Sequence, residues 1–307
     1  AASDVYKRQI LKGETTMEKF KEILKGKITE RVTDGEVIFN SVMKNNGLVS
    51  EEVMIPRKDE SMIPMVRLES YFEQHKNGRS IDDIAVEIIE ILMSHRQKEN
   101  FDLQKLLSDE NIKENVYFRI INKKRNKELL KDVPHMTYES LAMIIAINVN
   151  NLVKDEDEGE ASIVIHNIHM ERLHYTKEEL FAFAKQNTPR LFPVWRKSLQ
   201  ELFPTLPPCE AVENTLVLTN QSKLYGAGTI FYKDVLRETA EILRADRLVI
   251  LPSSIHEVLV LKQNTDSESK FYREMVQKVN YEAVRRDEVL DDTYYLYDKK
   301  TDRIKVC

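Results

Sequence analysis

A run of polar, potentially reactive side chains joins two short apolar segments, residues 248–251 and 258–261. The run contains Ser253, Ser254, His256 and Glu257. The apolar segments are short and rich in β-branched residues, which favours buried strands over helices. If strand geometry continued through the run, Ser254 and His256 would share one face, because alternate side chains of a strand point the same way. A hydroxyl held beside an imidazole could perform nucleophilic catalysis.

Three interpretations of this polar run stay open. In the first, Ser254, His256 and Glu257 form a hydrolase site. In the second, the run fixes the fold or contributes to a site for a ligand such as a small anion. The candidate ligand-binding residues are Arg190, Asn220, Ser253, Ser254 and His256. In the third, these are ordinary turn residues that cap strand ends. The Gly-x-Ser-x-Gly elbow of α/β-hydrolases is missing, so enzymatic activity stays uncertain and a non-enzymatic role is favoured.

Metal and cofactor signatures are also incomplete. His166, His169 and His174 lack a carboxylate or cysteine at a standard ligand spacing, so we expect surface histidines and no metal site. Gly226-Ala-Gly228 lacks the third glycine of a dinucleotide fingerprint, and it predicts a close approach of two backbone segments instead. No cofactor is therefore predicted.

The charge of the chain argues against general binding of nucleic acid. The net charge is −5, and phosphate affinity needs clustered Lys and Arg. One short basic cluster occurs, Lys123-Lys124-Arg125 with Lys127, and we favour a solvated turn over a phosphate site there. The apolar fraction of 42% is ample for a folded core.

Cysteine usage and hydropathy predict the compartment. The chain has two cysteines, Cys209 and Cys307, and no disulfide framework. No stretch approaches the roughly 20 apolar residues of a membrane span, and the segment after Met17 lacks the apolar region of a signal peptide. We therefore predict a soluble, cytoplasmic bacterial protein.

Residues 1–16 are interpreted as a translation artefact. Asp4–Gln9 matches a sequencing adapter translated in one frame, and Lys12–Glu14 matches a translated ribosome-binding site ahead of Met17. We expect Met17 to be the initiator and exclude the preceding residues from fold reasoning. The alternative is a genuine N-terminal arm.

Hydrophobic periodicity predicts a mixture of helices and strands. Helices are expected at 18–31, 81–94, 176–186, 234–244 and 267–281. Strands are expected at 36–42, 49–55, 62–68, 116–121, 141–149, 162–165, 215–218, 229–232, 248–251, 258–261, 293–297 and 303–306. The apolar face of the last helix is expected to carry Phe271, Met275 and Val279. Short connections between the strands favour an α+β fold with mostly antiparallel sheets and packed helices.

Five prolines between residues 189 and 208 interrupt this pattern. They predict a connector at 191–212 between two α/β modules, an N-terminal one at 17–190 and a C-terminal one at 213–307.

A series of short motifs carries a resemblance to a known family. The motifs are Lys44-Asn-Asn-Gly47, Asp132-Val-Pro134, Asn187–Pro193, Leu218-Thr-Asn220 followed by Gly226-Ala-Gly228, Ile250–Glu257 and Tyr294–Asp298. Spread over nearly the whole chain from Met17, they resemble the uncharacterised domain-of-unknown-function family 5688 (DUF5688), found mostly in gut Firmicutes. More distantly, the order of elements resembles the uncharacterised UPF0354 family. The resemblance implies no activity.

Well-patterned modules without a complete catalytic or cofactor motif predict a non-enzymatic protein that binds another protein. Such a protein would act as an adaptor, a chaperone-like module or a regulatory module. The alternative is a hydrolase or a small-anion-binding protein with its site around Ser254, His256 and Glu257. Arg119 and Arg190 would either meet an anion or hold carboxylates at a domain junction. We expect a protein partner, neither a membrane nor nucleic acid, and the oligomeric state stays open.

Overall fold

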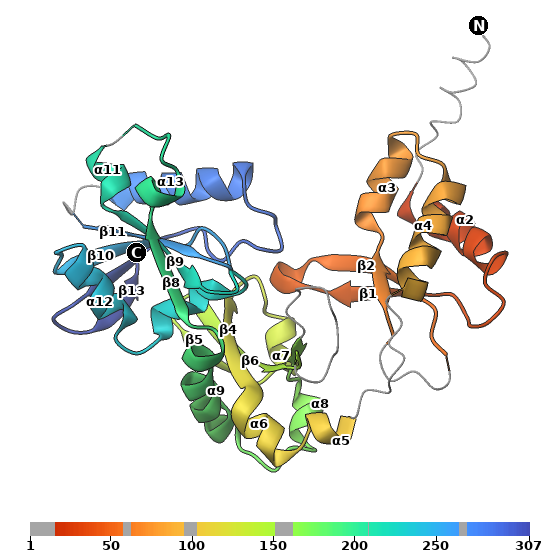
Figure 1. Cartoon of the computed structure of the whole chain (residues 1–307), viewed down its shortest axis with the longest axis horizontal. Coiled ribbons are helices and arrows are strands. Elements are labelled where there is room, and N and C mark those ends of the chain that lie inside the picture. The colour runs from red at the N-terminus through yellow and green to blue at the C-terminus, as the bar shows by residue number, and fades with distance from the viewer. Residues whose placement is uncertain (1–15, 58–62, 95–102, 151–161, 208, 264–268) are drawn as a thin grey trace, which may run out of the picture. The chain divides into compact units, whose positions relative to one another are not determined.

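The computed structural model describes residues 16–57, 63–94, 103–150, 162–207, 209–263 and 269–307 (Figure 1). Most of the segment interpreted as a translation artefact, residues 1–15, lies outside the described residues. The described chain divides into two compact units. The first takes the residues up to 94 except 45–48, and the second combines 45–48 with the residues from 103 onward.

The first unit packs helices against one small sheet. Its elements are α2 (Met17–Thr29), β1 (Ile38–Met43), β2 (Val49–Met54), β3 (Met65–Arg67), α3 (Glu69–Lys76) and α4 (Ile81–Ser94). The strands pair antiparallel in the order β1-β2-β3. This order places β3 at an edge, as Pro64 just before it predicts, because proline cannot donate to a neighbouring strand.

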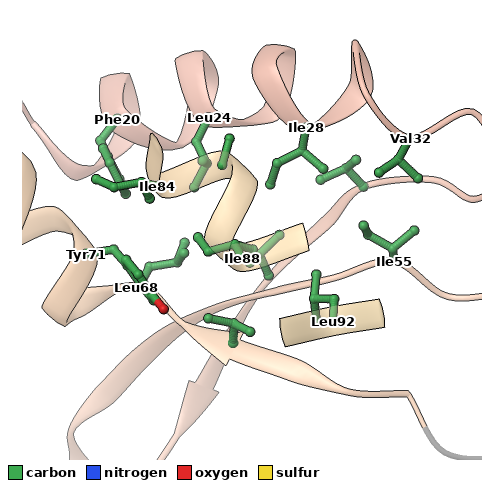
Figure 2. Close-up of a cluster of buried hydrophobic side chains, with 14 residues drawn as sticks. Phe20, Leu24, Ile28, Val32, Ile55, Leu68, Tyr71, Ile84, Ile88 and Leu92 are labelled. Atoms are coloured by element: carbon green, nitrogen blue, oxygen red, sulfur yellow. The ribbon is translucent and has the colours of Figure 1, made fainter. Parts of the chain in front are cut away.

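The core of the first unit follows from the amphipathic pattern of α2 and α4. Phe20, Leu24 and Ile28 recur every four residues along α2 and are fully buried. Ile84 and Ile88 of α4 face them (Figure 2). Each helix therefore presents one apolar stripe to the other elements of this unit, and burial of these stripes is the main stabilising contribution.

The second unit contains two larger sheets. Its elements are η1 (Asn45–Gly47), α5 (Leu103–Leu106), α6 (Asp109–Asn115), β4 (Val116–Asn122), α7 (Leu129–Asp132), β5 (His135–Tyr138), β6 (Leu141–Asn148), β7 (Ser162–Val164), α8 (Asn167–Met170), α9 (Lys177–Leu191), β8 (Val194–Ser198), α10 (Leu199–Leu202), α11 (Glu210–Glu213), β9 (Thr215–Asn220), η2 (Gly226–Phe231), α12 (Val235–Ile242), β10 (Arg247–Leu251), β11 (Val258–Lys262), α13 (Ser269–Glu282), β12 (Tyr295–Asp298) and β13 (Arg303–Val306).

Every strand pair among the described residues of the second unit is antiparallel. In the smaller sheet β6 pairs with β4, β5 and β7, and α9 packs on β4 and β6. The larger sheet has the order β13-β12-β10-β11-β9-β8. The predicted α+β class with mostly antiparallel sheets is confirmed. Among the described residues, no helix is both long and apolar enough to span a membrane.

The division of the chain differs from the predicted one. The segment 191–212, expected to be a connector, contains β8, which is the edge strand of the larger sheet and pairs with β9. The preceding helix α9 passes through Pro189 and ends at Leu191. The last turn is still closed by a hydrogen bond from the backbone N–H of Phe192 to the Thr188 carbonyl at 2.9 Å. The boundary between the units falls before residue 103 instead.

Residues 229–232, predicted to be a strand, lie in the 3₁₀ helix η2 and the residue after it. η2 begins at Gly226, where a Cβ atom would lie 2.0 Å from Thr219 Oγ1 and 2.6 Å from the carbonyl oxygen of His256. The predicted close approach of backbone is thus confirmed. Thr229 then closes the turn by donating its hydroxyl to the Gly226 carbonyl at 2.7 Å.

The buried face of α13 is also shifted by one residue from the predicted one. Tyr272, Val276 and Asn280 are buried, whereas Phe271 is 61% exposed. The ring of Tyr272 packs on Tyr294, with centroids 5.5 Å apart. Hydropathy alone favours burial of the face with Phe271. The contact between the rings of Tyr272 and Tyr294 and the hydrogen bond of Asn280 favour the neighbouring face instead.

Candidate functional site

The polar run between β10 and β11 does not have strand geometry. The strand β10 ends at Leu251, and residues 252–257 form a connecting loop. Within the loop the Ser254 hydroxyl accepts a hydrogen bond from the backbone N–H of His256 at 3.0 Å. The backbone N–H of Ser254 donates to the Glu257 carbonyl at 3.2 Å. Ser254 therefore closes a tight turn, and its hydroxyl bonds to the main chain of His256.

His256 is held by a backbone amide. Its Nδ1 accepts a hydrogen bond from the N–H of Tyr225 at 3.2 Å, which assigns the proton of the neutral ring to Nε2. Nε2 lies 3.7 Å from Glu288 Oε1. Burial lowers the pKa of His256, and the nearby Glu288 carboxylate acts in the opposite direction. Among the described residues, no hydroxyl hydrogen-bonds to this ring, so the geometry supports a fold-fixing role.

Asn220 and Arg190, two further predicted ligand-binding residues, lie in separate places. Asn220 lies beside Gly226, and its Nδ2 donates to the Leu224 carbonyl at 2.8 Å, closing a turn. Arg190 donates to the carbonyl of Glu114 and so holds the end of α6 against α9. The structure brings Asn220 to the loop of His256 and gives Arg190 a separate structural contact.

Ser253 and Arg119 have different neighbours. Ser253 borders a small, mostly apolar cavity of about 60 Å³ beside α13. Arg119, buried on β4, places its guanidinium 3.6 Å from the ring centroid of Tyr225 and donates to the Tyr117 hydroxyl. Arg119 thus supports the tyrosine whose backbone amide binds His256, entirely within the second unit.

The three histidines do not assemble a metal centre. His166 Nδ1 lies 2.7 Å from Asp132 Oδ2, and the backbone N–H of His166 donates to His169 Nδ1 at 3.1 Å. His174 is exposed. Throughout the part of the chain that the structure describes, no three His, Cys, Asp or Glu side chains are placed to hold a metal ion.

A cavity of about 830 Å³ lies at the end of β4, where sequence reasoning predicted only a solvated turn. We call it the lysine hollow. Its lining residues are Asn122, Lys123, Lys124, Arg125, Lys127, Leu130, Lys131, His135, Ser140, Asp291 and Asp292. The basic cluster after β4 and the start of α7 supply the cations. The turn between β5 and β6 and the loop before β12 supply the acidic and hydroxyl groups.

Positive charge exceeds negative charge around the lysine hollow, with five cationic side chains against two carboxylates. Arg125 pairs with Asp292, and Lys131 pairs with Glu128 outside the lining. The remaining cations, Lys123, Lys124 and Lys127, are exposed and make no ion pair with any described residue.

The floor of the lysine hollow is buried and polar. Asn122 is 4% exposed, and its Oδ1 accepts from the backbone N–H of Arg125 at 2.9 Å. Its Nδ2 has no hydrogen-bond partner among the described residues. Asp291 is 8% exposed, and its Oδ2 accepts from Ser140 Oγ and Tyr295 Oη, both at 2.5 Å. Burial raises the pKa of Tyr295, so its hydroxyl keeps its proton and donates.

The sequence contained one part of this site. The basic cluster was visible, but its neighbours Ser140 and Asp291 come from distant segments with no motif of their own. The largely buried Asn122 at a strand end, whose Nδ2 has no protein partner among the described residues but keeps access to solvent, is the feature that only the three-dimensional structure shows.

Comparison with known proteins identifies the family. Residues 17–299 match the family of unknown function DUF5688, and the chain belongs to that family. The suspected resemblance is thereby confirmed for DUF5688, whereas the link to UPF0354 stays a prediction. No curated protein matches the chain, and no solved structure matches it.

Proposed function

We propose that the second unit binds a small polyanion in the lysine hollow and acts as a binding module. The observation that carries the proposal is the group of three lysines, Lys123, Lys124 and Lys127, which line a cavity and have no carboxylate partner among the described residues. The chain as a whole carries a net charge of −5, so this concentration of positive charge is local.

Electrostatics gives the hollow a preference for anions. Lysines gathered around one concavity make the electrostatic potential inside it more positive. A concave surface focuses this potential on a small ligand. The lysine ammonium group is a compact point charge with three donors and binds phosphate groups well. Attraction of this kind weakens as added salt screens it.

Calorimetric titration of the full chain with pyrophosphate tests the proposal. The triple variant Lys123→Ala, Lys124→Ala, Lys127→Ala is expected to bind pyrophosphate at least about tenfold more weakly, and binding by the unaltered chain should weaken with added salt. The matched control is Lys233→Ala, Lys278→Ala, Lys300→Ala, which removes the same net charge from exposed lysines outside the lining.

Two outcomes would contradict the proposal. One is pyrophosphate affinity that is equal in the unaltered chain and the first triple variant. The other is an equal loss in both triple variants, since net charge rather than the hollow would then govern binding.

The sequence also predicts a protein partner and, as an alternative, a hydrolase at Ser254, His256 and Glu257. Both stay predictions. The hydrogen bond from the Tyr225 backbone to the ring of His256 favours the non-enzymatic one.

A further inference from the structure

We infer that the ligand of the lysine hollow is a phosphate ester whose alcohol part carries free hydroxyl groups, such as a sugar phosphate or a nucleoside monophosphate. This inference rests on the proposed anion binding and adds the chemistry of the second half of the ligand. It follows from the difference between the rim of the hollow and its floor.

The rim and the floor suit different groups of one ligand. The rim lysines, Lys123, Lys124 and Lys127, supply positive charge and only hydrogen-bond donors. The floor contains the carboxylate of Asp291, which is 8% exposed. A phosphate placed against this carboxylate would meet a like charge at short range in a poorly solvated place. The phosphate therefore belongs at the rim, and the floor requires an uncharged group.

The hydrogen bonds already made at the floor define what that uncharged group must be. Ser140 and Tyr295 both donate their hydroxyl protons to Asp291 Oδ2, and Asp291 Oδ1 accepts the backbone N–H of Asp292 at 2.8 Å. Each carboxylate oxygen accepts two hydrogen bonds, so Oδ1 keeps one acceptor site. Ser140 Oγ also lies 2.8 Å from Tyr295 Oη, and with two lone pairs it keeps one acceptor site beyond that contact.

Asn122 supplies the complementary donor. Its Oδ1 is engaged with Arg125 N–H, while its Nδ2 lacks a partner among the described residues in a side chain that is 4% exposed. Because Asn122 Nδ2 is not one of the fully buried polar atoms that lack a partner, it keeps access to solvent, and a ligand hydroxyl can take the place of that solvent. A hydroxyl group of a ligand matches both the free donor and the free acceptors of the floor. It can accept a hydrogen bond from Asn122 and donate one to Asp291 or Ser140.

The size of the lysine hollow agrees with a ligand that has two parts. A volume of about 830 Å³ lies within the range of roughly 300–1,000 Å³ that small-molecule sites occupy. Such a volume accommodates a phosphate group at the rim together with a polyol at the floor.

A pair of matched esters tests the inference with the full chain. Ribose 5-phosphate and pentyl phosphate share a phosphate monoester and five carbon atoms, and they differ in their hydroxyl groups. We expect ribose 5-phosphate to bind at least about tenfold more tightly by calorimetric titration, as one or two additional hydrogen bonds would give. Pyrophosphate is titrated in parallel, and adenosine monophosphate tests whether a nucleoside or a simple sugar is the better alcohol part.

Two variants assign the discrimination to the floor. Asn122→Asp keeps the oxygen that accepts from the backbone N–H of Arg125 and replaces the Nδ2 donor by a second carboxylate oxygen. Ser140→Ala removes the serine hydroxyl. In each, the ratio of the two ester affinities is expected to fall toward one. The charge added by Asn122→Asp weakens both esters, which carry the same phosphate, and largely cancels in the ratio. Neither variant removes Asp291, whose loss could prevent folding.

The outcomes separate this inference from the proposed function. If pyrophosphate binds and the two esters bind equally, the inference is overturned and anion binding stands. If none of the anions binds, the proposed function is overturned as well. A preference for ribose 5-phosphate that persists in both variants overturns the assignment to the floor residues. A preference that both variants abolish supports it.

Discussion

The Nδ1 atom of His256 accepts a hydrogen bond from the backbone N–H of Tyr225 at 3.2 Å, while Tyr225 adopts the left-handed conformation with φ of 53°. A non-glycine residue in this region is strained and needs support from its surroundings. The imidazole acceptor and the Arg119 guanidinium on the tyrosine ring provide that support. The histidine therefore fixes the entrance to η2.

Replacing this acceptor is expected to destabilise the protein. His256→Phe retains a ring and leaves the Tyr225 amide without its partner, and we expect it to lower the free energy of unfolding by about 1–2 kcal/mol in urea denaturation. His256→Asn is the matched control, because its Oδ1 can occupy the position of Nδ1 and accept the same bond. Equal stability of the two variants would show that the hydrogen bond contributes nothing.

Stability is expected to depend on pH through two half-buried histidines, His169 and His256. Burial lowers the pKa of both His169 and His256 from the ordinary value of 6.5. Below pH 6.5 the unfolded chain then binds more protons than the folded chain, so their contribution is complete above that pH and is lost as pH falls through the folded-state values. Urea denaturation between pH 7.5 and pH 5 should show this loss, and it should be smaller in His256→Asn. An unchanged pH dependence in the variant would contradict the assignment to His256.

Substitution of glycine by alanine is expected to change stability in opposite directions at Gly226 and Gly26. Gly226→Ala would place a methyl group 2.7 Å from the backbone N of Asn220, so we expect a loss of at least about 3 kcal/mol or failure to fold. Gly26 lies exposed within α2 with no atom near its missing Cβ, and Gly26→Ala is expected to stabilise by about 0.5–1 kcal/mol. Thermal unfolding measures both. Tolerance of Gly226→Ala would refute the close approach.

The hydroxyl of Tyr295 is expected to matter for stability. Tyr295 is 1% exposed and donates to Asp291, so Tyr295→Phe removes one donor from a buried carboxylate and should cost about 1–3 kcal/mol. Tyr281→Phe, at a side chain that is 92% exposed, is the control and should change stability by less than about 0.5 kcal/mol. Similar effects of the two substitutions would contradict this role of Asp291.

Local patterns predicted most elements of the fold, and non-local contacts account for the exceptions. The stripe of Ile84 and Ile88 in α4 was visible because helical periodicity depends only on neighbouring residues. The strand β8 was missed because prolines surround it and its pairing with β9 involves distant residues. The buried face of α13 was misassigned because Asn280 is held by a hydrogen bond to the Asp291 carbonyl.

The candidate site, too, was predictable only where local sequence patterns determine it. Ser254 and His256 are close in sequence, and that proximity suggested chemistry, but each is engaged with backbone groups. The residues of the lysine hollow are separated by up to 170 positions, from Asn122 to Asp292, so composition revealed only its basic rim. Its floor could be recognised only from the low exposure of Asn122 and Asp291 and from the hydrogen bonds of their side chains.

The membership of residues 45–48 in the second unit limits how the chain can be truncated. Asn126, 1% exposed, donates to Asn45 Oδ1 at 2.9 Å and accepts from the backbone N–H of Asn46 at 2.8 Å. Deleting everything before residue 103 would strip these partners from an asparagine that lies in the same turn as Lys124 and Lys127. A fragment designed to isolate ligand binding must therefore retain residues 45–48, even though 54 residues, 49–102, lie between them and Leu103 in the sequence.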